Sequence, residues 1–273
     1  MNESFRASIV VPLLNQDDSW LRRCVLSALS QTVRTEVVVI VSADTRTSNR
    51  LLLEELQADW STLVVQPQES GRGFPAAINQ GIRGSSSARV GFLLSDDWLA
   101  PAAVEKCLRY DTAIVSTGLA GFAGDGRAAL PSVDVDIKAS EFERCPTLES
   151  KANYLSHFFL FRRSKIDEVG GLDETLGDAP GIDDYDFIWT LLEHEATVSI
   201  VEERLYCYRD HNQDRLSLRP ASEQMATLSR ILVKHGVTGR EREHILRSHG
   251  RWFGKPIHVA QAELAGMRGL ERT

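Results

Sequence analysis

The sequence lacks any apolar run that would cross a membrane. A transmembrane helix needs about 18 or more consecutive apolar residues, and no such stretch occurs among the 273 residues. The first residues, MNESFRAS, also lack the basic start of a secretory signal. We therefore expect a cytoplasmic protein, with peripheral contact at the inner face of a membrane as the open alternative.

Cysteine is scarce as well. The four cysteines, Cys24, Cys107, Cys145 and Cys207, are scattered along the chain and form no Cys-x-x-Cys pair. Four cysteines in a chain of this length are typical of free thiols in a reducing compartment, not of a disulfide framework.

Basic residues are outnumbered. The chain has 31 Lys and Arg against 38 Asp and Glu, a net charge of −7, which argues against general nucleic-acid binding. The balance is uneven, because residues 219–273 hold ten basic and five acidic residues and the remainder carries −12. The basic tail indicates a solvated helical face, with an anionic partner as the alternative.

What the sequence does contain is an alternation of strands and helices in its first hundred residues. Continuous apolar runs predict strands at 7–13, 36–41, 62–65 and 88–94. Apolar residues at helical spacing predict helices at 18–31, 48–58 and 74–83. Apolar runs without polar alternation are typical of a mostly parallel sheet covered by helices on both faces. The pattern therefore predicts an α/β fold.

The second half of the chain is less regular. Residues 118–150 are rich in Gly, Ala, Asp and Pro and predict a long loop region with at most one short strand pair. A helix at 183–195 and short strands at 197–201 and 205–208 are expected next. From Pro220 the pattern predicts three helical segments, broken near Gly236 and at Lys255-Pro256.

Two adjacent aspartates follow the fourth predicted strand. Asp96 and Asp97 could cap the following helix, or they could hold a divalent cation through oxygen ligands. Ligands in parallel sheets bind beyond the carboxyl ends of the strands. We therefore expect the pair at a ligand site, together with Asn15, Asp44 and the loop 67–75.

Two more clusters lie in the second half. Asp183-Asp184, with Asp186, opens a predicted helix, where the helix dipole alone stabilises carboxylates. Arg209-Asp210-His211 follows a predicted strand, and a lone surface histidine there would be weak evidence for a site.

Eight segments in order carry a resemblance to a known family. They read ASIVVPLLNQ, CVLSALSQT, EVVVIVSADTRTSN, ESGRGFPAAINQGI, ARVGFLLSDDWLAP, FLFRRSKIDEVGGLDE, GIDDYDFIWTL and LYCYRDHNQDRLS. Together they resemble a family 2 inverting glycosyltransferase of the GT-A fold, a Rossmann-like, mostly parallel twisted sheet flanked by helices. The resemblance implies a glycosyltransferase domain at 1–217, with a nucleotide-sugar-binding half at 1–117 and an acceptor and catalytic half at 118–217. A helical C-terminal extension at 218–273 follows.

The resemblance also implies a donor site with Mn²⁺ or Mg²⁺. Asp97 would hold the ion, Asp96 would share it or contact the ribose, and His211 would complete the metal or diphosphate contacts. The other donor contacts implied are Pro12, Asn15, Asp44, Gly71, Arg72, Gly73, Asn79 and Arg209. A cation explains the aspartate pair, because it offsets their repulsion and bridges them to the donor diphosphate.

Transfer to a hydroxyl also needs a base. Asp184 matches the family's base position, and Asp183 either tunes it through like-charge repulsion or hydrogen-bonds the acceptor. Arg209 either balances the diphosphate charge or forms a surface salt bridge. Trp98 either fills the core or stacks on a sugar.

Departures from the family pattern keep other functions open. Leu94 stands where a further aspartate is common, and residues 41–43 stand where a base-reading aspartate is common, so a catalytically impaired nucleotide-binding homologue is one alternative. A sugar nucleotidyltransferase is another, although it would need a Gly-rich basic loop where this chain has PLLNQDDSW. The Gly-x-Gly at 71–73 is too weak a signal for a dinucleotide dehydrogenase.

The expected partners follow from the leading hypothesis. They are a nucleotide-sugar donor, most simply a UDP-sugar, and a carbohydrate, lipid-linked or small-molecule hydroxyl acceptor, with no nucleic acid. The apolar spacing of the tail predicts helices that pack on the domain, on a second copy of the chain, or on an anionic membrane surface.

Overall fold

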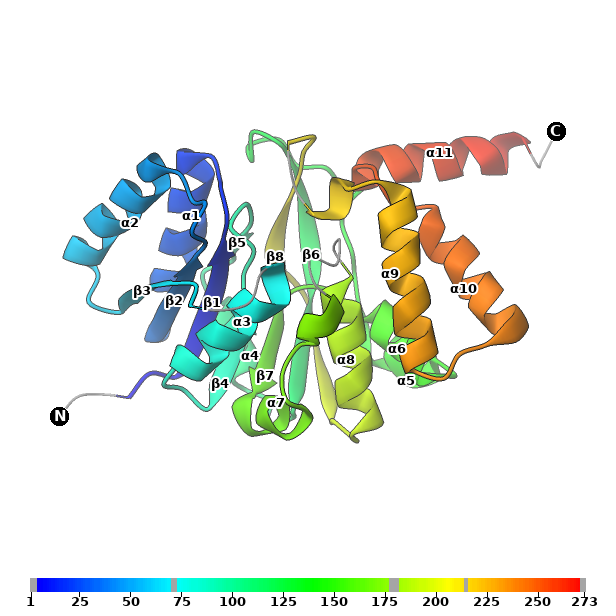
Figure 1. Cartoon of the computed structure of the whole chain (residues 1–273), viewed down its shortest axis with the longest axis horizontal. Helices are drawn as coiled ribbons and strands as arrows, with labels where there is room; N and C mark the ends of the chain where they lie inside the picture. Colours follow the sequence, from blue (N-terminus) through cyan, green and yellow to red (C-terminus); the bar gives the residue numbers. More distant parts are fainter. Residues whose placement is uncertain (1–3, 70–72, 177–181, 214–215, 271–273) are drawn as a thin grey trace.

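One mixed sheet forms the centre of the protein. The structure is a computed structural model that describes residues 4–69, 73–176, 182–213 and 216–270. Within these residues the sheet has eight strands in the order β3-β2-β1-β4-β7-β6-β8-β5, with helices on both sides (Figure 1). The strands are β1 (Ala7–Leu13), β2 (Thr35–Val41), β3 (Leu63–Pro67), β4 (Arg89–Phe92), β5 (Trp98–Leu99), β6 (Ile114–Ala123), β7 (Phe159–Arg162) and β8 (Val198–Asp210).

The helices divide between the two halves of the chain. The first half holds α1 (Asp18–Leu29), α2 (Thr47–Asp59), α3 (Gly73–Gly84) and α4 (Ala103–Cys107). The second half holds α5 (Ala139–Arg144), α6 (Leu148–Tyr154), α7 (Arg163–Val169), α8 (Asp183–Glu193), α9 (Ala221–Lys234), α10 (Gly239–Gly250) and α11 (Ile257–Leu270). The predicted α/β fold is confirmed, and the three helical segments of the tail appear where the sequence places their breaks.

The two halves of the sheet differ in strand direction. β3, β2, β1 and β4 run parallel to one another, as the continuous apolar runs predict. β7 is antiparallel to both of its neighbours, β4 and β6. β8 is parallel to β6, and the short β5 is antiparallel to β8. The expectation of a mostly parallel sheet therefore holds for the first half, whereas the second half is mixed.

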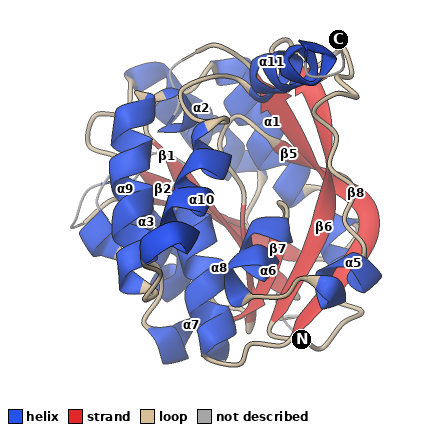
Figure 2. Ribbon diagram, turned by 90° about the vertical axis from the view of Figure 1, so that its right-hand side faces the viewer, coloured by secondary structure: helices blue, strands red, loops and turns tan. Residues whose placement is uncertain are grey.

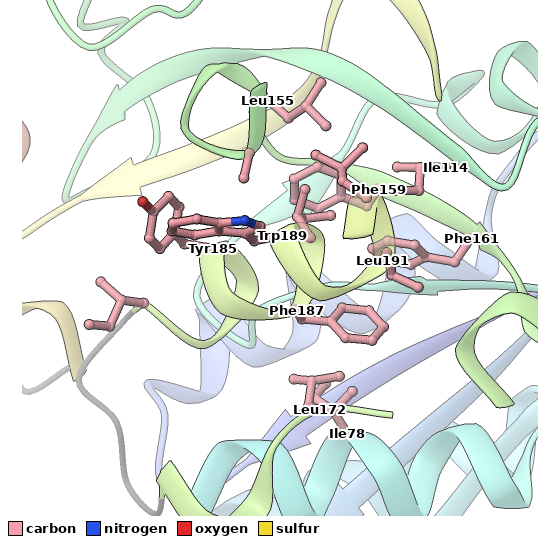
Figure 3. Close-up of a cluster of buried hydrophobic side chains, with 14 of the residues drawn as sticks. Ile78, Ile114, Leu155, Phe159, Phe161, Leu172, Tyr185, Phe187, Trp189 and Leu191 are labelled. Carbon is pink, nitrogen blue, oxygen red and sulfur yellow. The ribbon is translucent and has the colours of Figure 1, made fainter. Parts of the chain in front are cut away.

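Both faces of the sheet are buried. Along β1, Val10 lies in a core with α3 and α8, while Ile9 and Val11 lie in a second core with α1, α2 and α4. Figure 3 shows the first core around α8, where Phe159, Phe161 and Phe187 come together. Burial on both faces is the reason that the parallel strands read as unbroken apolar runs.

The strand β6 occupies part of the region expected to be a loop. It spans ten residues and includes Gly118 and Gly121. A Cβ at Gly118 would lie 2.7 Å from the carbonyl oxygen of Val135, and a Cβ at Gly121 would lie 2.5 Å from the Cβ of Val133. The glycines are needed because the segment before α5 lies directly against the strand.

β8 is also longer than predicted. The two short strands expected at 197–201 and 205–208 are one strand of 13 residues. The polar residues between the two predicted pieces lie opposite an irregularity in the pairing with β6, between Thr117 and Leu119. The strand therefore continues to Asp210, and His211 follows immediately after it at the edge of the sheet.

The C-terminal extension packs on α8. Leu228, Ile231 and Leu232 of α9 are fully buried in the same core as α8. Lys234 and His235 contact the buried carboxylate of Asp186 at 2.7 and 3.0 Å.

The helix α11 projects from the end of the sheet formed by β6 and β8 (Figures 1 and 2). Among the described residues, no helix is long and apolar enough to span a membrane.

Candidate functional site

The site is built at the carboxyl edge of the sheet, where β4 ends. A turn closed by the hydrogen bond from the Asp97 amide to the Leu94 carbonyl, 3.1 Å, carries Asp96 and Asp97 between β4 and β5. The pair does not cap α4, which begins at Ala103 without a side-chain cap. Of the two roles that the sequence left open, helix capping is excluded.

Asp97 is buried and anchors the end of β8. Its Oδ1 accepts a hydrogen bond from the backbone N–H of Arg209 at 2.7 Å, and its Oδ2 accepts one from the Tyr206 hydroxyl at 2.5 Å. Burial raises the pKa of Tyr206 well above its ordinary value, and the negative charge of Asp97 raises it further. The tyrosine therefore stays protonated and donates to the carboxylate.

Asp96 faces the histidine loop instead. Its Oδ2 lies 3.0 Å from Nε2 of His211, and its side chain is 13% exposed. The backbone N–H of Gln213 donates to Nδ1 of His211 at 3.1 Å. Because Nδ1 accepts that bond, the proton of a neutral imidazole is on Nε2, which donates to Asp96. The structure thus joins two of the predicted site residues, 115 positions apart in the chain.

Arg209 is buried, not on the surface. Its Nε donates to the carbonyl of Asp96 at 2.8 Å and its Nη1 to the carbonyl of Gly124 at 3.0 Å. Its guanidinium carbon lies 4.4 Å from the ring centroid of Trp20 and 5.1 Å from that of Trp98. The alternative of a surface salt bridge is therefore wrong. Arg209 holds the backbone of the aspartate turn and leaves a buried positive charge beside it.

Trp98 is a core residue. Its side chain is buried in β5 and packs against Phe122, with 4.7 Å between ring centroids. The guanidinium carbon of Arg23 lies 3.4 Å from the Trp98 ring centroid, and Arg23 donates to the carbonyl of Gly126. Of the two roles considered for Trp98, filling the core is confirmed.

The second acidic cluster begins α8. Asp183 is buried, whereas the side chain of Asp184 is 37% exposed and its Oδ2 lies 3.4 Å from Nδ1 of His157. Asp186, one turn along, is buried and contacts Lys234 and His235 of the extension. The three carboxylates therefore differ in surroundings, and Asp184 is the half-exposed one.

Six of the remaining predicted donor residues separate into three groups. Asn15 and Asp44 come together, because the side chain of Asn15 donates to the Asp44 carbonyl at 3.3 Å. Pro12 lies in β1 opposite Ile40 of β2, and Gly73 begins α3 with a φ of 83°. Gly71 and Arg72 lie outside the described residues.

Asn79 does not join the aspartates. It is buried in α3, where its Oδ1 accepts from the N–H of Leu172 at 2.8 Å and its Nδ2 donates to the Leu172 carbonyl at 2.9 Å. A Cβ at Gly171, where φ is 85°, would lie 2.4 Å from Asn79 Oδ1. The amide thus fastens α3 to the loop after α7, and the donor contact expected of Asn79 stays a prediction.

Sequence reasoning missed two residues that the fold brings to the site. Tyr206 hydrogen-bonds Asp97 from within β8, and His157 reaches Asp184 from the segment before β7. Tyr206 stood in the recognised segment LYCYRDHNQDRLS without a role, and His157 preceded FLFRRSKIDEVGGLDE. Neither residue shows a local signal, because each contact is made across the fold.

The side chains at the aspartate turn supply only some of the ligands that a hard divalent cation needs. Within the residues that the structure describes, no group of three or more His, Cys, Asp or Glu side chains is arranged to hold a metal ion. Mg²⁺, however, is commonly bound through one or two carboxylates together with substrate phosphates. Asp96 offers such a carboxylate, and His211 would bind through Nε2 only as the Nδ1–H tautomer, which gives up its hydrogen bonds with Asp96 and Gln213.

Comparison with known proteins identifies the family. The family model described as Glycosyl transferase family 2 matches residues 8–170. The O-antigen biosynthesis protein RfbC of Myxococcus xanthus is 27% identical over 209 residues, which cover 74% of this chain but only 16% of that protein.

Solved structures share the fold. S. aureus TarS in complex with UDP-GlcNAc superposes with a TM-score of 0.63 at 15% identity, covering 88% of this chain and 69% of that chain. A mannosyltransferase from Pyrobaculum calidifontis in complex with GDP-Man and Mn²⁺ gives a TM-score of 0.64 at 14% identity, covering 97% of this chain and 76% of that chain. These likenesses support the GT-A architecture.

Proposed function

The chain belongs to glycosyl transferase family 2, and from that premise we propose that it transfers a sugar from a nucleoside-diphosphate sugar to a hydroxyl acceptor with inversion. One observation carries the proposal most directly: Asp96 and His211 meet at the carboxyl edge of the sheet, where ligands of such sheets bind. The buried guanidinium of Arg209 adds positive charge next to that turn.

We propose a division of roles within the aspartate pair that differs from the sequence-based expectation. Both oxygens of Asp97 accept hydrogen bonds from β8, and its side chain is 1% exposed. Asp96 is more accessible and faces His211. Asp96 would therefore hold a Mn²⁺ or Mg²⁺ ion with His211, and Asp97 would fix the turn. When bound, the ion supplies charge stabilisation for the departing diphosphate.

Asp184 would serve as the base. Its carboxylate is half-exposed at the start of α8, so an acceptor hydroxyl can approach it. In the proposed step the acceptor oxygen bonds to the anomeric carbon, the bond to the diphosphate oxygen breaks, and Asp184 takes the hydroxyl proton. A single displacement of this kind inverts the anomeric centre. Asp183, buried beside Asp184, would act on Asp184 through like-charge repulsion or contact the acceptor.

The donor and acceptor classes are drawn from the relatives. The two structural neighbours are in complex with UDP-GlcNAc and with GDP-Man, and a UDP-sugar is our first choice for the donor of this chain. RfbC is named for O-antigen biosynthesis, so a growing polysaccharide or lipid-linked glycan is the acceptor class we favour. The chain spans 16% of the length of that relative.

Ligand-dependent thermal stability tests the proposed function. A ligand present at about 100 times its dissociation constant stabilises the folded state by about 2.7 kcal/mol. We expect UDP or GDP to raise the melting temperature only when Mn²⁺ or Mg²⁺ is present. NAD and ATP should have no effect under the same conditions. Stabilisation by NAD, or none by either diphosphate with metal, would contradict the proposal.

A further inference from the structure

His157 contacts the proposed base from another part of the fold. It lies in the segment between α6 and β7, and its Nδ1 is 3.4 Å from Oδ2 of Asp184. The two side chains are 36% and 37% exposed. Even when both groups are charged, a pair at this exposure contributes only about 0–1 kcal/mol to stability, so folding alone gives little reason for the contact.

The backbone that carries His157 is fixed. The N–H of Phe158 donates to Oγ1 of Thr117 at 3.1 Å, and the N–H of Thr117 donates to the carbonyl of Phe158 at 3.1 Å. Leu155 and Phe159 flank the segment and reach into the buried cluster beneath it (Figure 3). The imidazole therefore starts from an ordered position, held between β6 and the core around α8.

Aromatic rings hold the imidazole from the sides. The His157 ring centroid lies 5.5 Å from that of Tyr206 and 5.9 Å from that of Phe159. Tyr206 is also the residue whose hydroxyl donates to Asp97. Asp184, His157, Tyr206 and Asp97 therefore form one continuous series of contacts from the proposed base to the aspartate turn.

The contact with Asp184 determines which tautomer of His157 is required. A carboxylate only accepts hydrogen bonds, so a bond to Oδ2 of Asp184 requires a proton on Nδ1 of His157. Nε2 of His157 has no hydrogen-bond partner among the described residues. The N–H of Tyr185 donates to Oδ1 of Asp184 at 2.9 Å. The two carboxylate oxygens are thus approached from two directions, which fixes the plane of the carboxylate.

We propose that His157 is a positioning residue for Asp184, donating its Nδ1–H to Oδ2 and aligning the carboxylate for an acceptor hydroxyl. The inference rests on the proposed function, because it assigns a partner to the proposed base. The contact of 3.4 Å is long for a hydrogen bond, and such contacts commonly tighten once substrate is bound.

The tautomer of His157 tests the contact without any substrate. Histidine labelled with ¹⁵N reports the protonated nitrogen by NMR at about pH 8, above the ordinary histidine pKa of about 6.5. The signal is assigned by its loss in His157→Asn. We expect the Nδ1–H form in the wild type and a smaller share of it in Asp184→Ala. An Nε2–H form in the wild type, or a spectrum that Asp184→Ala leaves unchanged, would overturn the inference.

Turnover tests the positioning role. The assay measures UDP release from UDP-GlcNAc and GDP release from GDP-Man. Asparagine places an amide N–H near the position of Nδ1, whereas leucine keeps volume and donates nothing. Because a misplaced group costs up to about 100-fold, we expect His157→Leu to lower kcat about tenfold or more with an unchanged KM for the donor, and His157→Asn to recover most of the loss.

Controls separate this inference from the proposed function. His194→Leu alters an exposed histidine at the far end of α8, whose Nδ1 contacts the Thr190 carbonyl, and should behave as the wild type. If Asp184→Asn is inactive but His157→Leu turns over normally, the inference fails and the proposed function stands. If Asp184→Asn is fully active, the base assignment fails, and the NMR result still decides whether the contact exists.

Discussion

The C-terminal extension should stabilise the second half of the chain from within a core that it shares with α8. Leu232 of α9 is fully buried in the cluster that contains α8, whereas its neighbour Val233 is 62% exposed. The two residues are consecutive on one helix, and alanine favours the helix more than either of them, so helix propensity cannot explain a loss of stability. Substituting each by alanine isolates the contribution of packing against α8.

The expected magnitude follows from cavity formation. Replacing a buried leucine by alanine removes apolar contact and leaves a cavity, at a cost of about 2–5 kcal/mol. Val233→Ala, on the exposed face, should change stability by about 0.5 kcal/mol or less. With a denaturation slope of about 3 kcal/mol per molar urea, the midpoint for Leu232→Ala should fall by about 1 M.

Urea unfolding followed by tryptophan fluorescence is the measurement. Trp189 of α8 stacks on His235 of the extension, with ring centroids 4.2 Å apart and planes 5° apart, so its emission reports the junction. Truncation after Ser217 should lower stability further, because it removes α9 completely. Equal midpoints for Leu232→Ala and Val233→Ala would refute the shared core. A fully stable truncated protein would refute it as well.

Three further predictions follow from the site and its surroundings. Asp184→Asn should lower turnover by about 10² to 10⁴ while leaving donor affinity near normal; an equal loss from Asp183→Asn alone, measured in the same assay, would move the base by one residue. Burial acts to raise the pKa of Glu149, but the His249 imidazole 3.7 Å away and the hydrogen bond from the Tyr185 hydroxyl outweigh it and lower that pKa. The carboxylate therefore contributes stability above its unfolded pKa of about 4.3 and loses it as pH falls through the lowered folded value, so urea midpoints of wild type and Glu149→Gln should differ at neutral pH and converge in acid.

The third of these concerns α11. Asp210 accepts hydrogen bonds from the backbone N–H of His258 at 2.8 Å and from that of Ile257 at 3.2 Å, and it contacts Nδ1 of His258 at 2.7 Å. Asp210→Asn should therefore loosen α11 and speed its removal by limited proteolysis. Unchanged cleavage would show that this cap does not hold the helix.

The parallel half of the fold could be predicted because its signal is local. Strands buried on both faces read as nearly continuous apolar runs, as in β1 and β2, where the buried polar residues Ser8 and Glu36 hydrogen-bond each other. The turn after β4 is then placed at the carboxyl edge of the sheet, where ligands of such sheets bind. The breaks between the tail helices, near Gly236 and Pro256, could be predicted in the same way. Glycine and proline interrupt helices for reasons that do not depend on the rest of the fold.

The second half of the fold was harder to predict because its structure depends on contacts between residues that are far apart in the sequence. Gly118 and Gly121 read as loop residues, yet they stand in β6 because residues 133–135 lie against the strand. Asn79 matched a motif, but its amide is used by the Leu172 backbone. No local pattern shows which backbone groups a buried side chain will meet.

The different contacts of Asp96 and Asp97 show the same limit of prediction from sequence. The sequence identifies the pair, but only the fold reveals that Tyr206 and the Arg209 amide engage Asp97 while His211 faces Asp96. Residues from β8, more than a hundred positions away, engage both oxygens of Asp97 and leave Asp96 the more accessible carboxylate.

The central claim is that the aspartate turn binds a nucleotide donor through a divalent cation held by Asp96. Isothermal titration of UDP and GDP, with Mn²⁺ and then with excess chelator, tests it most directly on wild type and Asp96→Asn, with Asp59→Asn as a control at an exposed carboxylate that ends α2. We predict metal-dependent binding in the wild type and in Asp59→Asn, and its loss in Asp96→Asn while the melting temperature without ligand stays near that of the wild type. Wild-type affinity and metal dependence in Asp96→Asn, or diphosphate binding that the chelator does not affect, would contradict the account.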